Sequence, residues 1–263
     1  MSFRSALILS TVLAAWSAAA AAETIKIGVT PGPHAQIFEA VKPVAAKQGL
    51  DIQLIEFSDY VVPNAALDAG DIQANSFQNQ PYLDNQKADR GYKIEAVGLT
   101  VNFPIGVYSK KHKSWADIPD GGKVSIPNDP TNGGRVLLLL RDKGVIKLKD
   151  GTGFKPTVLD ITENPKKLKF VEVDAAQAPR ALDDVDFAAI QGNFAIYSGL
   201  KLTNAFALEK MTTPYINVVA VKRGNVESQW AQDIVTAYKS PRFKTAILSN
   251  RFYDGFALPD YLR

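Results

Sequence analysis

Residues 23–57 read ETIKIGVTPGPHAQIFEAVKPVAAKQGLDIQLIEF, and this stretch decides the fold. Its first residues alternate in polarity and stop at Pro31-Gly32-Pro33, which predicts a strand that ends in a loop. Apolar residues then recur at helical spacing until Gly49, where the predicted helix ends. A second strand is predicted over 51–57. A strand, a helix and a strand in this order indicate two parallel strands with a right-handed crossover.

The same alternation of predicted elements continues to the end of the chain. Further strands are predicted at 72–77, 94–99, 103–108, 123–126, 157–160, 169–173, 187–191 and 216–222, and further helices at 63–69, 80–90, 136–143, 175–182, 194–200, 204–208, 228–239 and 241–250. This pattern predicts an α/β protein with mainly parallel sheets. The length allows one large domain or two smaller lobes.

The first 22 residues predict a secretory signal. Arg4 is followed by an uncharged run of mostly small residues from Ala6 to Ala22, and Ala20-Ala21-Ala22 offers a cleavage site before Glu23. A membrane-spanning helix needs about 20 strongly apolar residues, and this run is shorter and rich in alanine. An uncleaved membrane anchor is the alternative.

The composition excludes several classes of protein. The formal net charge is +3, which is too mild for nucleic-acid binding, since that requires clustered basic faces. The sequence has no cysteine, which excludes disulfides, thiol nucleophiles, cysteine metal sites and a lipid-modified cysteine at the signal junction. We therefore expect a soluble protein in an exported compartment.

The most informative motif is IPNDPTNGGR at 126–135, followed directly by VLLLL. A polar loop that opens a helix presents backbone N–H groups and the positive end of the helix dipole, which favours a bound anion. Arg135 adds a planar fork of donors suited to a carboxylate or phosphate. The alternatives are a structural salt bridge for Arg135 and turn or cap roles for Asn128 and Asn132.

Polar clusters follow several predicted strands, and open α/β sheets bind ligands at the carboxyl ends of their strands. These clusters suit a zwitterionic amino acid, whose carboxylate would pair with Arg135. The side-chain carbonyls of Asn193 and Asn217 are candidate acceptors for its ammonium group. Candidate walls for an apolar ligand side chain are Tyr60, Phe77 and Tyr82. Each of these residues also has an ordinary interpretation as a core or loop residue.

Signals for catalysis or metal binding are weak. His34 and His112 are the only histidines in the sequence, and neither lies in a recognisable metal or triad motif. The acidic run 183–186 lacks the spaced oxygen ligands of a calcium loop. The sequence has no phosphate loop and no dinucleotide-binding motif. We expect no catalytic residues, no metal and no cofactor.

The chain resembles the substrate-binding proteins of methionine ABC importers, the NlpA/MetQ lipoprotein family, from about Lys26 to the C-terminus. The strings that carry the resemblance are FSDYVVPNAAL (57–67), NSFQNQPYL (75–83), PIGVYSKKH (104–112), IPNDPTNGGRVLLLL (126–140), ITENPKKLKF (161–170), AQAPRALDDVDFA (176–188) and QGNFA (191–195). Several of them are long and unusual in composition.

The resemblance implies a type II-like periplasmic-binding-protein fold, with two α/β lobes joined by two crossovers around a ligand cleft. It implies that 23–104 and 218–263 form lobe I and that 105–217 forms lobe II. It also implies that a monomer delivers an amino acid, most often methionine, to an ABC permease driven by an ATPase. The implied ligand-binding residues are Tyr60, Phe77, Asn79, Tyr82, Asn132, Arg135, Asn193 and Asn217.

The resemblance implies roles for these residues. In the family, the arginine holds the ligand carboxylate, two asparagines bind the amino-acid backbone, and the aromatic residues enclose the ligand side chain. Two positions depart from the family pattern, because Asn79 replaces a histidine and Gln191 stands where asparagine is common. An amide at Asn79 favours, as an alternative, a different amino acid or a methionine-containing dipeptide.

The resemblance also bears on location and on other classes of function. Many relatives carry a lipid on a cysteine at the signal junction, and this sequence has no cysteine. We therefore expect a protein that diffuses freely in the periplasm of a Gram-negative cell and is not lipid-anchored. The remaining alternatives are an exported enzyme that uses the same cleft and a surface adhesin.

Overall fold

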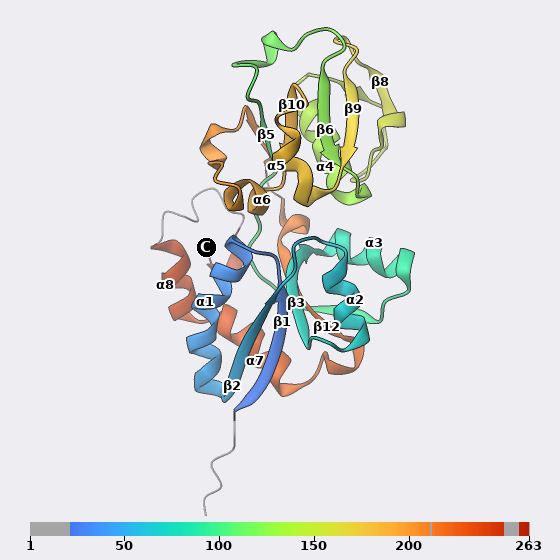
Figure 1. Ribbon diagram of the computed structural model, residues 1–263. Coiled ribbons are helices and arrows are strands. Elements are labelled where there is room, and N and C mark those ends of the chain that lie inside the picture. Colours follow the sequence, from blue (N-terminus) through green and yellow to red (C-terminus); the bar gives the residue numbers. More distant parts are fainter. Residues whose placement is uncertain (1–21, 211, 250–257, 263) are drawn as a thin grey trace, which may run out of the picture.

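The computed structural model describes residues 22–210, 212–249 and 258–262. Figure 1 shows the chain folded into two α/β lobes, one above the other. The lower lobe holds the first and last parts of the described chain, and the upper lobe holds its middle. The bilobed α/β fold is therefore confirmed. The predicted signal, apart from its last residue, lies outside the described residues.

The sheet of the lower lobe has the strand order β2-β1-β3-β12-β4. Its strands are β1 (Glu23–Val29), β2 (Leu50–Glu56), β3 (Ala74–Asn79), β4 (Ile94–Leu99) and β12 (Asn217–Lys222). Helices α1 (Pro33–Ala45), α7 (Gln229–Tyr238) and α8 (Pro241–Leu248) cover one face, and α2 (Val62–Ala69) and α3 (Gln80–Arg90) cover the other. The side chains of β12 alternate between these two cores, since Val219 faces the first and Val218 the second.

The sheet of the upper lobe has the strand order β11-β5-β10-β6-β9. Its strands are β5 (Gly106–Tyr108), β6 (Lys123–Pro127), β9 (Lys169–Val173), β10 (Phe187–Ile190) and β11 (Ala207–Leu208). Helix α4 (Pro130–Asp142) packs on one face, and α5 (Ala178–Ala181) and α6 (Gly192–Tyr197) pack on the other. The short strands β7 (Lys147–Leu148) and β8 (Ile161–Glu163) form a separate antiparallel pair.

Both sheets are mixed, so the prediction of mainly parallel sheets was wrong. Strand β1 pairs in parallel with β2 and β3, and β6 pairs in parallel with β9 and β10. Strands β12 and β5 pair antiparallel with their neighbours. These two strands enter their sheets directly from the other lobe, so no helical crossover within the lobe sets their direction.

The segments that join the lobes run side by side. The first leaves β4 for β5, and the second returns from β11 to β12. The N–H of Thr100 donates to the carbonyl of Asn217 at 2.7 Å, and the N–H of Glu209 donates to the carbonyl of Ile105 at 2.9 Å. The two crossovers are therefore hydrogen-bonded to each other along the junction.

The largest difference between a predicted and an observed element is in α4, which begins at Pro130 rather than at residue 136. Asp129 caps this helix, and Pro130 occupies its first turn, where a missing N–H costs nothing. The glycines of the motif lie inside the helix. A Cβ on Gly133 would come within 2.8 Å of the carbonyl of Pro127, so only glycine allows this approach to β6.

Three shorter elements also differ from their predictions. The predicted strand at 157–160 is a 3₁₀ turn, Val158–Asp160, closed by a capping box. The predicted helix at 204–208 ends in strand β11, because Ala207 and Leu208 pair with β5. The predicted helix at 175–182 is a 3₁₀ turn followed by α5. Tertiary pairing overrides local propensity in such short segments.

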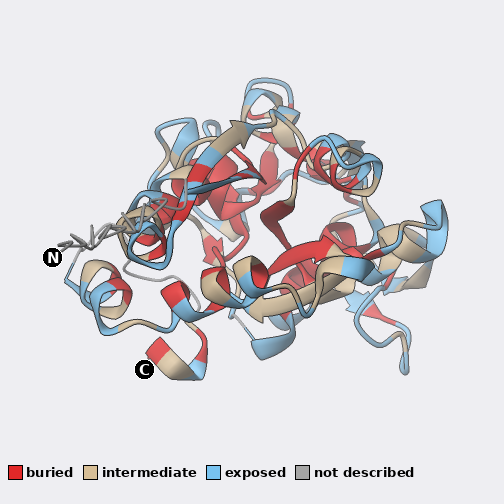
Figure 2. Ribbon diagram, turned by 90° about the horizontal axis from the view of Figure 1, so that it is seen from below, coloured by how far each residue is buried: buried red, intermediate tan, exposed pale blue. Residues whose placement is uncertain are grey.

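Burial follows this layered arrangement. Figure 2 shows the buried residues concentrated in the strands and on the inward faces of the helices. Among the described residues, no helix combines the length and apolar character needed to cross a membrane.

Candidate functional site

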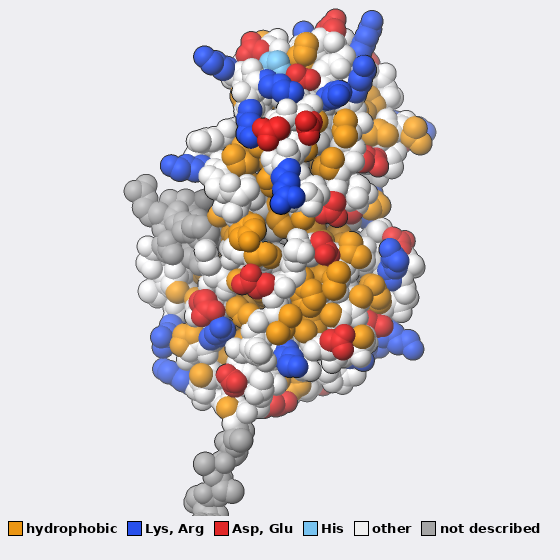
Figure 3. Space-filling model, viewed as in Figure 1, with side chains coloured by type: hydrophobic (Ala, Val, Ile, Leu, Met, Phe, Trp, Pro, Cys, Tyr) orange, Lys and Arg blue, Asp and Glu red, His pale blue; other side chains and the backbone are white. Residues whose placement is uncertain are grey.

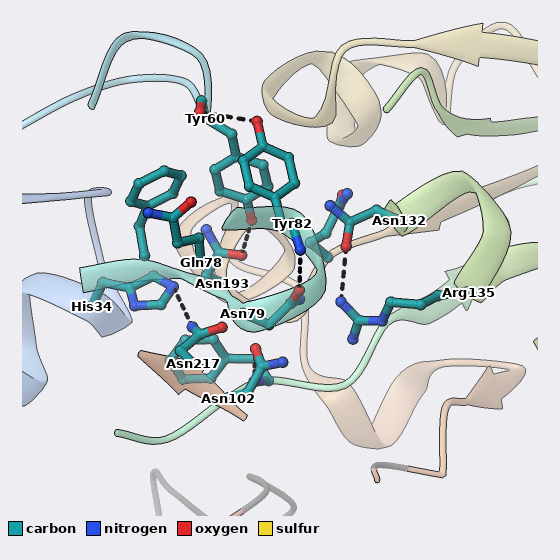
Figure 4. Close-up of a pocket in the computed structure, with 13 residues that line it drawn as sticks. His34, Tyr60, Gln78, Asn79, Tyr82, Asn102, Asn132, Arg135, Asn193 and Asn217 are labelled. Carbon is teal, nitrogen blue, oxygen red and sulfur yellow. Dashed lines mark hydrogen bonds between the residues drawn. The ribbon is translucent and has the colours of Figure 1, made fainter. Parts of the chain in front are cut away.

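A cavity lies between the two lobes. Figure 4 shows the side chains around it, which come from both lobes. The lining residues are His34, Tyr60, Phe77, Gln78, Asn79, Tyr82, Asn102, Phe103, Asn132, Arg135, Gln191, Asn193 and Asn217.

The structure brings all eight predicted site residues to this one cavity. Most follow the carboxyl end of a strand: Phe77 and Asn79 end β3, Asn132 and Arg135 follow β6, and Asn193 follows β10. This is the edge at which open α/β sheets bind ligands. The contact of these residues with a ligand stays a prediction.

Arg135 lies in the second turn of α4 and is 4% exposed. Its Nε donates to Oε1 of Glu209 at 2.8 Å, and its Nη2 donates to Oε2 at 2.5 Å. Its Nη1 donates to the side-chain carbonyl of Asn132 at 2.8 Å, and its Cζ lies 4.7 Å from the ring centroid of Tyr215. Burial alone would lower the pKa of Arg135, but the adjacent Glu209 carboxylate raises it above its ordinary value.

The structural salt bridge that was the alternative for Arg135 is present. The guanidinium also lines the cavity, and its contact with a ligand stays a prediction. Glu209 was not predicted from the sequence, because it lies 74 positions from Arg135, after a segment predicted as a helix, and no motif marks it. Only the pairing of β11 with β5 places it beside α4.

Asn132 links Arg135 to a second carboxylate. Its backbone N–H and its side-chain amide each donate to Asp129 at 2.8 Å, and its carbonyl accepts from Arg135. Asp129 is the N-cap of α4, and burial raises its pKa. The predicted cap role thus belongs to Asp129, and Asn132 holds the guanidinium in place.

Aromatic rings form one wall of the cavity. The ring of Tyr60 lies 5.7 Å from Phe77 and 5.0 Å from Phe194, and Phe77 lies 6.1 Å from Tyr82. The hydroxyl of Tyr82 donates to the carbonyl of Tyr60 at 3.0 Å. Burial raises the pKa of both tyrosines, so both stay neutral. The wall is therefore mostly apolar with fixed rings.

Asn193 connects the two lobes. Its side-chain carbonyl accepts from the hydroxyl of Tyr60 at 2.5 Å, and its amide donates to the hydroxyl of Thr30 at 3.3 Å. Tyr60 and Thr30 belong to the lower lobe, and Asn193 lies in the first turn of α6 of the upper lobe. A residue predicted to bind ligand therefore also bridges the junction.

Asn217 and His34 lie on the opposite side of the cavity. The amide nitrogen of Asn217 lies 3.5 Å from Nε2 of His34, and the ring of His34 meets Phe103 edge-on at 4.8 Å. Burial lowers the pKa of His34 to about 3, so this histidine is neutral at pH 7. The sequence predicts no ligand role for His34, since the position of this residue in the cavity wall depends on where α1 begins.

Asn79 caps helix α3, because its side-chain carbonyl accepts from the N–H of Tyr82 at 3.0 Å. Because this oxygen already accepts a hydrogen bond, the amide nitrogen is the group of Asn79 that can donate to a ligand. Asn79 pairs in register with Asn217 on the neighbouring strand β12. Two amides thus stand side by side on the floor of the cavity.

Gln191 is the least satisfied residue of the cavity. It is 4% exposed, and neither its amide nitrogen nor its carbonyl oxygen has a hydrogen-bond partner within the described structure. Buried polar groups are nearly always paired, so an orphaned amide in a cavity points to a ligand that both donates and accepts. From the sequence, Gln191 was marked only as a departure from the family pattern.

Comparisons with known proteins agree with this architecture. The NlpA lipoprotein family matches residues 25–261. The D-methionine-binding lipoprotein MetQ of Escherichia coli (strain K12) is 48% identical over 238 residues, which cover 89% of this chain and 87% of that protein.

Two solved structures have a closely similar fold. A nutrient binding protein from Burkholderia cenocepacia, bound to methionine, is 52% identical with a TM-score of 0.84, covering 89% of this chain and 98% of that one. A protein from Coxiella burnetii, described as an ABC transporter, periplasmic substrate-binding protein, is 43% identical with a TM-score of 0.84, covering 89% of this chain and all (100%) of that one.

The family corrects the predicted location. A freely diffusing protein without a lipid anchor was expected, but the matching family is one of lipoproteins, and MetQ of Escherichia coli is itself named a lipoprotein. That expectation rested on the absence of one residue type, which is not evidence about how a protein is held at a membrane.

The matches span nearly the whole described chain, so they cover both lobes and both crossovers. The two solved structures share the overall fold of this chain, each with a TM-score of 0.84. The relatives are named as binding proteins rather than enzymes. This chain belongs to the NlpA lipoprotein family.

Proposed function

We propose that this chain is the substrate-binding protein of an ABC importer and that it binds methionine between its lobes. The observation that supports this best is a buried guanidinium opposite an aromatic wall in one cavity, in a chain 52% identical to a protein whose structure holds methionine. We also propose that residues 23–104 and 218–263 form lobe I and that residues 105–217 form lobe II. The protein acts as a monomer, which delivers its ligand to a permease driven by an ATPase.

In this proposal, the backbone of the amino acid lies near Arg135, Gln191 and Asn217. The guanidinium pairs with the carboxylate, because charge-assisted hydrogen bonds to arginine are short and strong. The amide of Gln191, which has no partner among the described residues, accepts from the ammonium group and donates to the carboxylate. This contact would remove the cost of burying an unpaired amide.

The side chain of methionine then lies against Tyr60, Phe77 and Tyr82. A thioether suits such a wall, since sulfur–aromatic contacts are favourable by about 0.3–1.5 kcal/mol each. Asn79 presents its amide nitrogen to the end of the side chain. A weak acceptor such as a thioether sulfur can face that donor.

Asn79 also supports the second candidate, a different amino acid or a methionine-containing dipeptide. A carbonyl or other oxygen at the end of the ligand would accept a stronger hydrogen bond from its amide than sulfur would. This candidate keeps the same fold and the same backbone contacts, and it differs only in what meets Asn79.

Delivery of the ligand to a permease depends on closure of the two lobes around it. A ligand that contacts both lobes stabilises the closed arrangement by its differential affinity for the closed and open states. The hydrogen bond between Tyr60 and Asn193 crosses the same junction. The closed protein is then the form that a permease would recognise.

Mass spectrometry of ligand released from the purified protein tests this proposal, followed by calorimetry with L-methionine, D-methionine, other amino acids and methionine-containing dipeptides. Dissociation constants for methionine in the micromolar to nanomolar range, about −8 to −12 kcal/mol, are expected. Tighter binding of another amino acid or a dipeptide would select the second candidate. Turnover of any bound ligand, or no binding of the whole series, would contradict both.

On the face drawn in Figure 3, positive and negative side chains are interspersed, and hydrophobic side chains gather near the junction and over the lower lobe. That face therefore presents no continuous basic surface of the kind that nucleic acid requires.

A further inference from the structure

The carboxylate of Glu209 is the nearest charge to Arg135 and is almost as buried as its partner. The two side chains are 3% and 9% exposed. Two parallel hydrogen bonds of 2.8 and 2.5 Å join them. This is the bidentate geometry in which a carboxylate and a guanidinium balance each other's charge. The arginine that lines the cavity is therefore already neutralised.

Glu209 is also fixed to the junction of the lobes. Its Oε2 accepts from the backbone N–H of Ile105 at 3.0 Å, and its own N–H donates to the carbonyl of Ile105. Ile105 belongs to the first crossover and Glu209 to the second. The carboxylate thus cannot turn away from Arg135 without breaking its hydrogen bond to the N–H of Ile105.

This arrangement has a consequence for the charge that a ligand can carry. A zwitterionic amino acid adds one negative and one positive charge, so the group of Glu209, Arg135 and ligand stays neutral. A carboxylate ligand without an ammonium group adds one uncompensated negative charge to a buried site, which is costly. If Glu209 were neutral, the same anion would be balanced by Arg135.

Other ionisable groups at the cavity do not alter this difference. His34 is neutral at pH 7, because burial lowers its pKa to about 3. Asp129 contacts Asn132 rather than the Glu209 carboxylate. Its charge is the same in a comparison of two ligands or of two variants at position 209.

We propose that Glu209 is a specificity-determining residue, which makes the cavity select a zwitterionic amino acid over the corresponding anion by balancing the charge of Arg135. This inference rests on the proposed function and adds to it the class of ligand charge that the site accepts. Glu209 acts through Arg135, so it is a positioning residue and not a ligand contact.

Calorimetry at pH 7 with two ligands tests the inference. The first is methionine, and the second is 4-(methylthio)butanoate, which is methionine without its ammonium group and brings no added bulk. The purified protein is compared with Glu209→Gln, which keeps the size and loses the charge, and with Glu209→Asp, which keeps the charge. Glu163→Gln is the matched control, because Glu163 pairs with Lys147 at 2.9 Å on the surface.

We expect the unaltered protein to prefer methionine. Glu209→Gln should reduce that preference by about tenfold or more, because without the charge of Glu209 the guanidinium of Arg135 balances the carboxylate of the anion. Glu209→Asp and Glu163→Gln should keep the preference. A Glu209→Gln variant that weakens both ligands equally would overturn the inference, because a merely structural role has that effect.

Two further outcomes are distinguishable from these. If Glu209→Gln does not fold, the unaltered protein decides, and binding of the anion as tightly as methionine would overturn the inference while leaving the proposed function intact. If the unaltered protein binds neither ligand, the assignment of methionine fails, and the inference as tested with methionine fails with it.

Discussion

The hydroxyl of Tyr60 donates a 2.5 Å hydrogen bond to the side-chain carbonyl of Asn193, and this bond joins the lower lobe to the upper lobe. The same tyrosine ring packs 5.0 Å from Phe194, the next residue of α6. One side chain therefore forms part of the cavity wall and holds the lobes together. We therefore expect ligand affinity and closure to be coupled through Tyr60.

Tyr60→Phe should weaken ligand binding while it preserves the aromatic wall. The ring remains, but the closed form loses one hydrogen bond, worth about 0.5–1.5 kcal/mol, or up to about tenfold in affinity. Calorimetry with methionine measures the loss, and small-angle scattering measures the population of open protein without ligand. Tyr197→Phe is the control, because Tyr197 is 61% exposed. Equal affinity in both variants would show that this bond does not support closure.

Arg135→Met should abolish most ligand binding and also destabilise the protein. Removing the guanidinium leaves Glu209 as a buried charge without its partner, which costs about 3–5 kcal/mol in comparable sites. Thermal unfolding and calorimetry separate the two effects. Arg141→Met is the control, since Arg141 lies on the same helix and pairs with Asp142 at the surface.

A double variant separates the stability effect from the ligand effect. Arg135→Met with Glu209→Gln removes both charges, so the unfolding free energy should recover towards that of the unaltered protein, since a buried pair can be replaced by neutral groups at little cost. Ligand binding should stay lost. Recovery of binding in the double variant would mean that Arg135 does not contact the ligand.

Much of this architecture follows from periodicity and motifs. Strand β1, helix α1 and strand β2 lie within a few residues of their predicted positions, because apolar spacing and Gly49 mark them locally. The cavity was predictable because the carboxyl ends of the strands carry the polar motifs. All eight predicted site residues line it.

The parts that could not be predicted depend on contacts between distant segments. The partner of Arg135 is 74 residues away, and only the antiparallel pairing of β11 with β5 brings Glu209 to it. The sequence offered a ligand role and a salt bridge as alternatives for Arg135. The structure shows that one guanidinium can line the cavity and also be paired.

Acidification should destabilise the protein through His34. Its pKa in the folded protein is lowered to about 3 by burial, whereas an unfolded chain protonates histidine near pH 6.5. The unfolded state therefore binds more protons between these values, and the unfolding free energy falls as the pH falls through this range. The slope contributed by one such proton is at most about 1.4 kcal/mol per pH unit.

Urea unfolding at a series of pH values measures this slope. His34→Gln should make the dependence shallower between about pH 6 and pH 4, a window set by these two pKa values. His112→Gln leaves His34 in place and controls for the number of histidines. The same slope in His34→Gln and in the unaltered protein would show that this histidine is not the group that titrates.

Gln191→Leu should weaken ligand binding without destabilising the protein, whereas Arg135→Met should do both. In the ligand-free protein, the buried amide of Gln191 has no partner among the described residues, so its removal should leave the unfolding free energy equal or raise it by about 1 kcal/mol. Ligand affinity should fall by about tenfold or more, because the amide is paired only when the ligand is bound.

Gln86→Leu is the matched control. The side-chain oxygen of Gln86 is likewise buried and unpaired within the described chain, but this residue is not among those that line the cavity. Calorimetry and thermal unfolding of both variants decide the matter, and a Gln191→Leu protein that binds methionine as tightly as before would show that the orphaned amide serves no ligand.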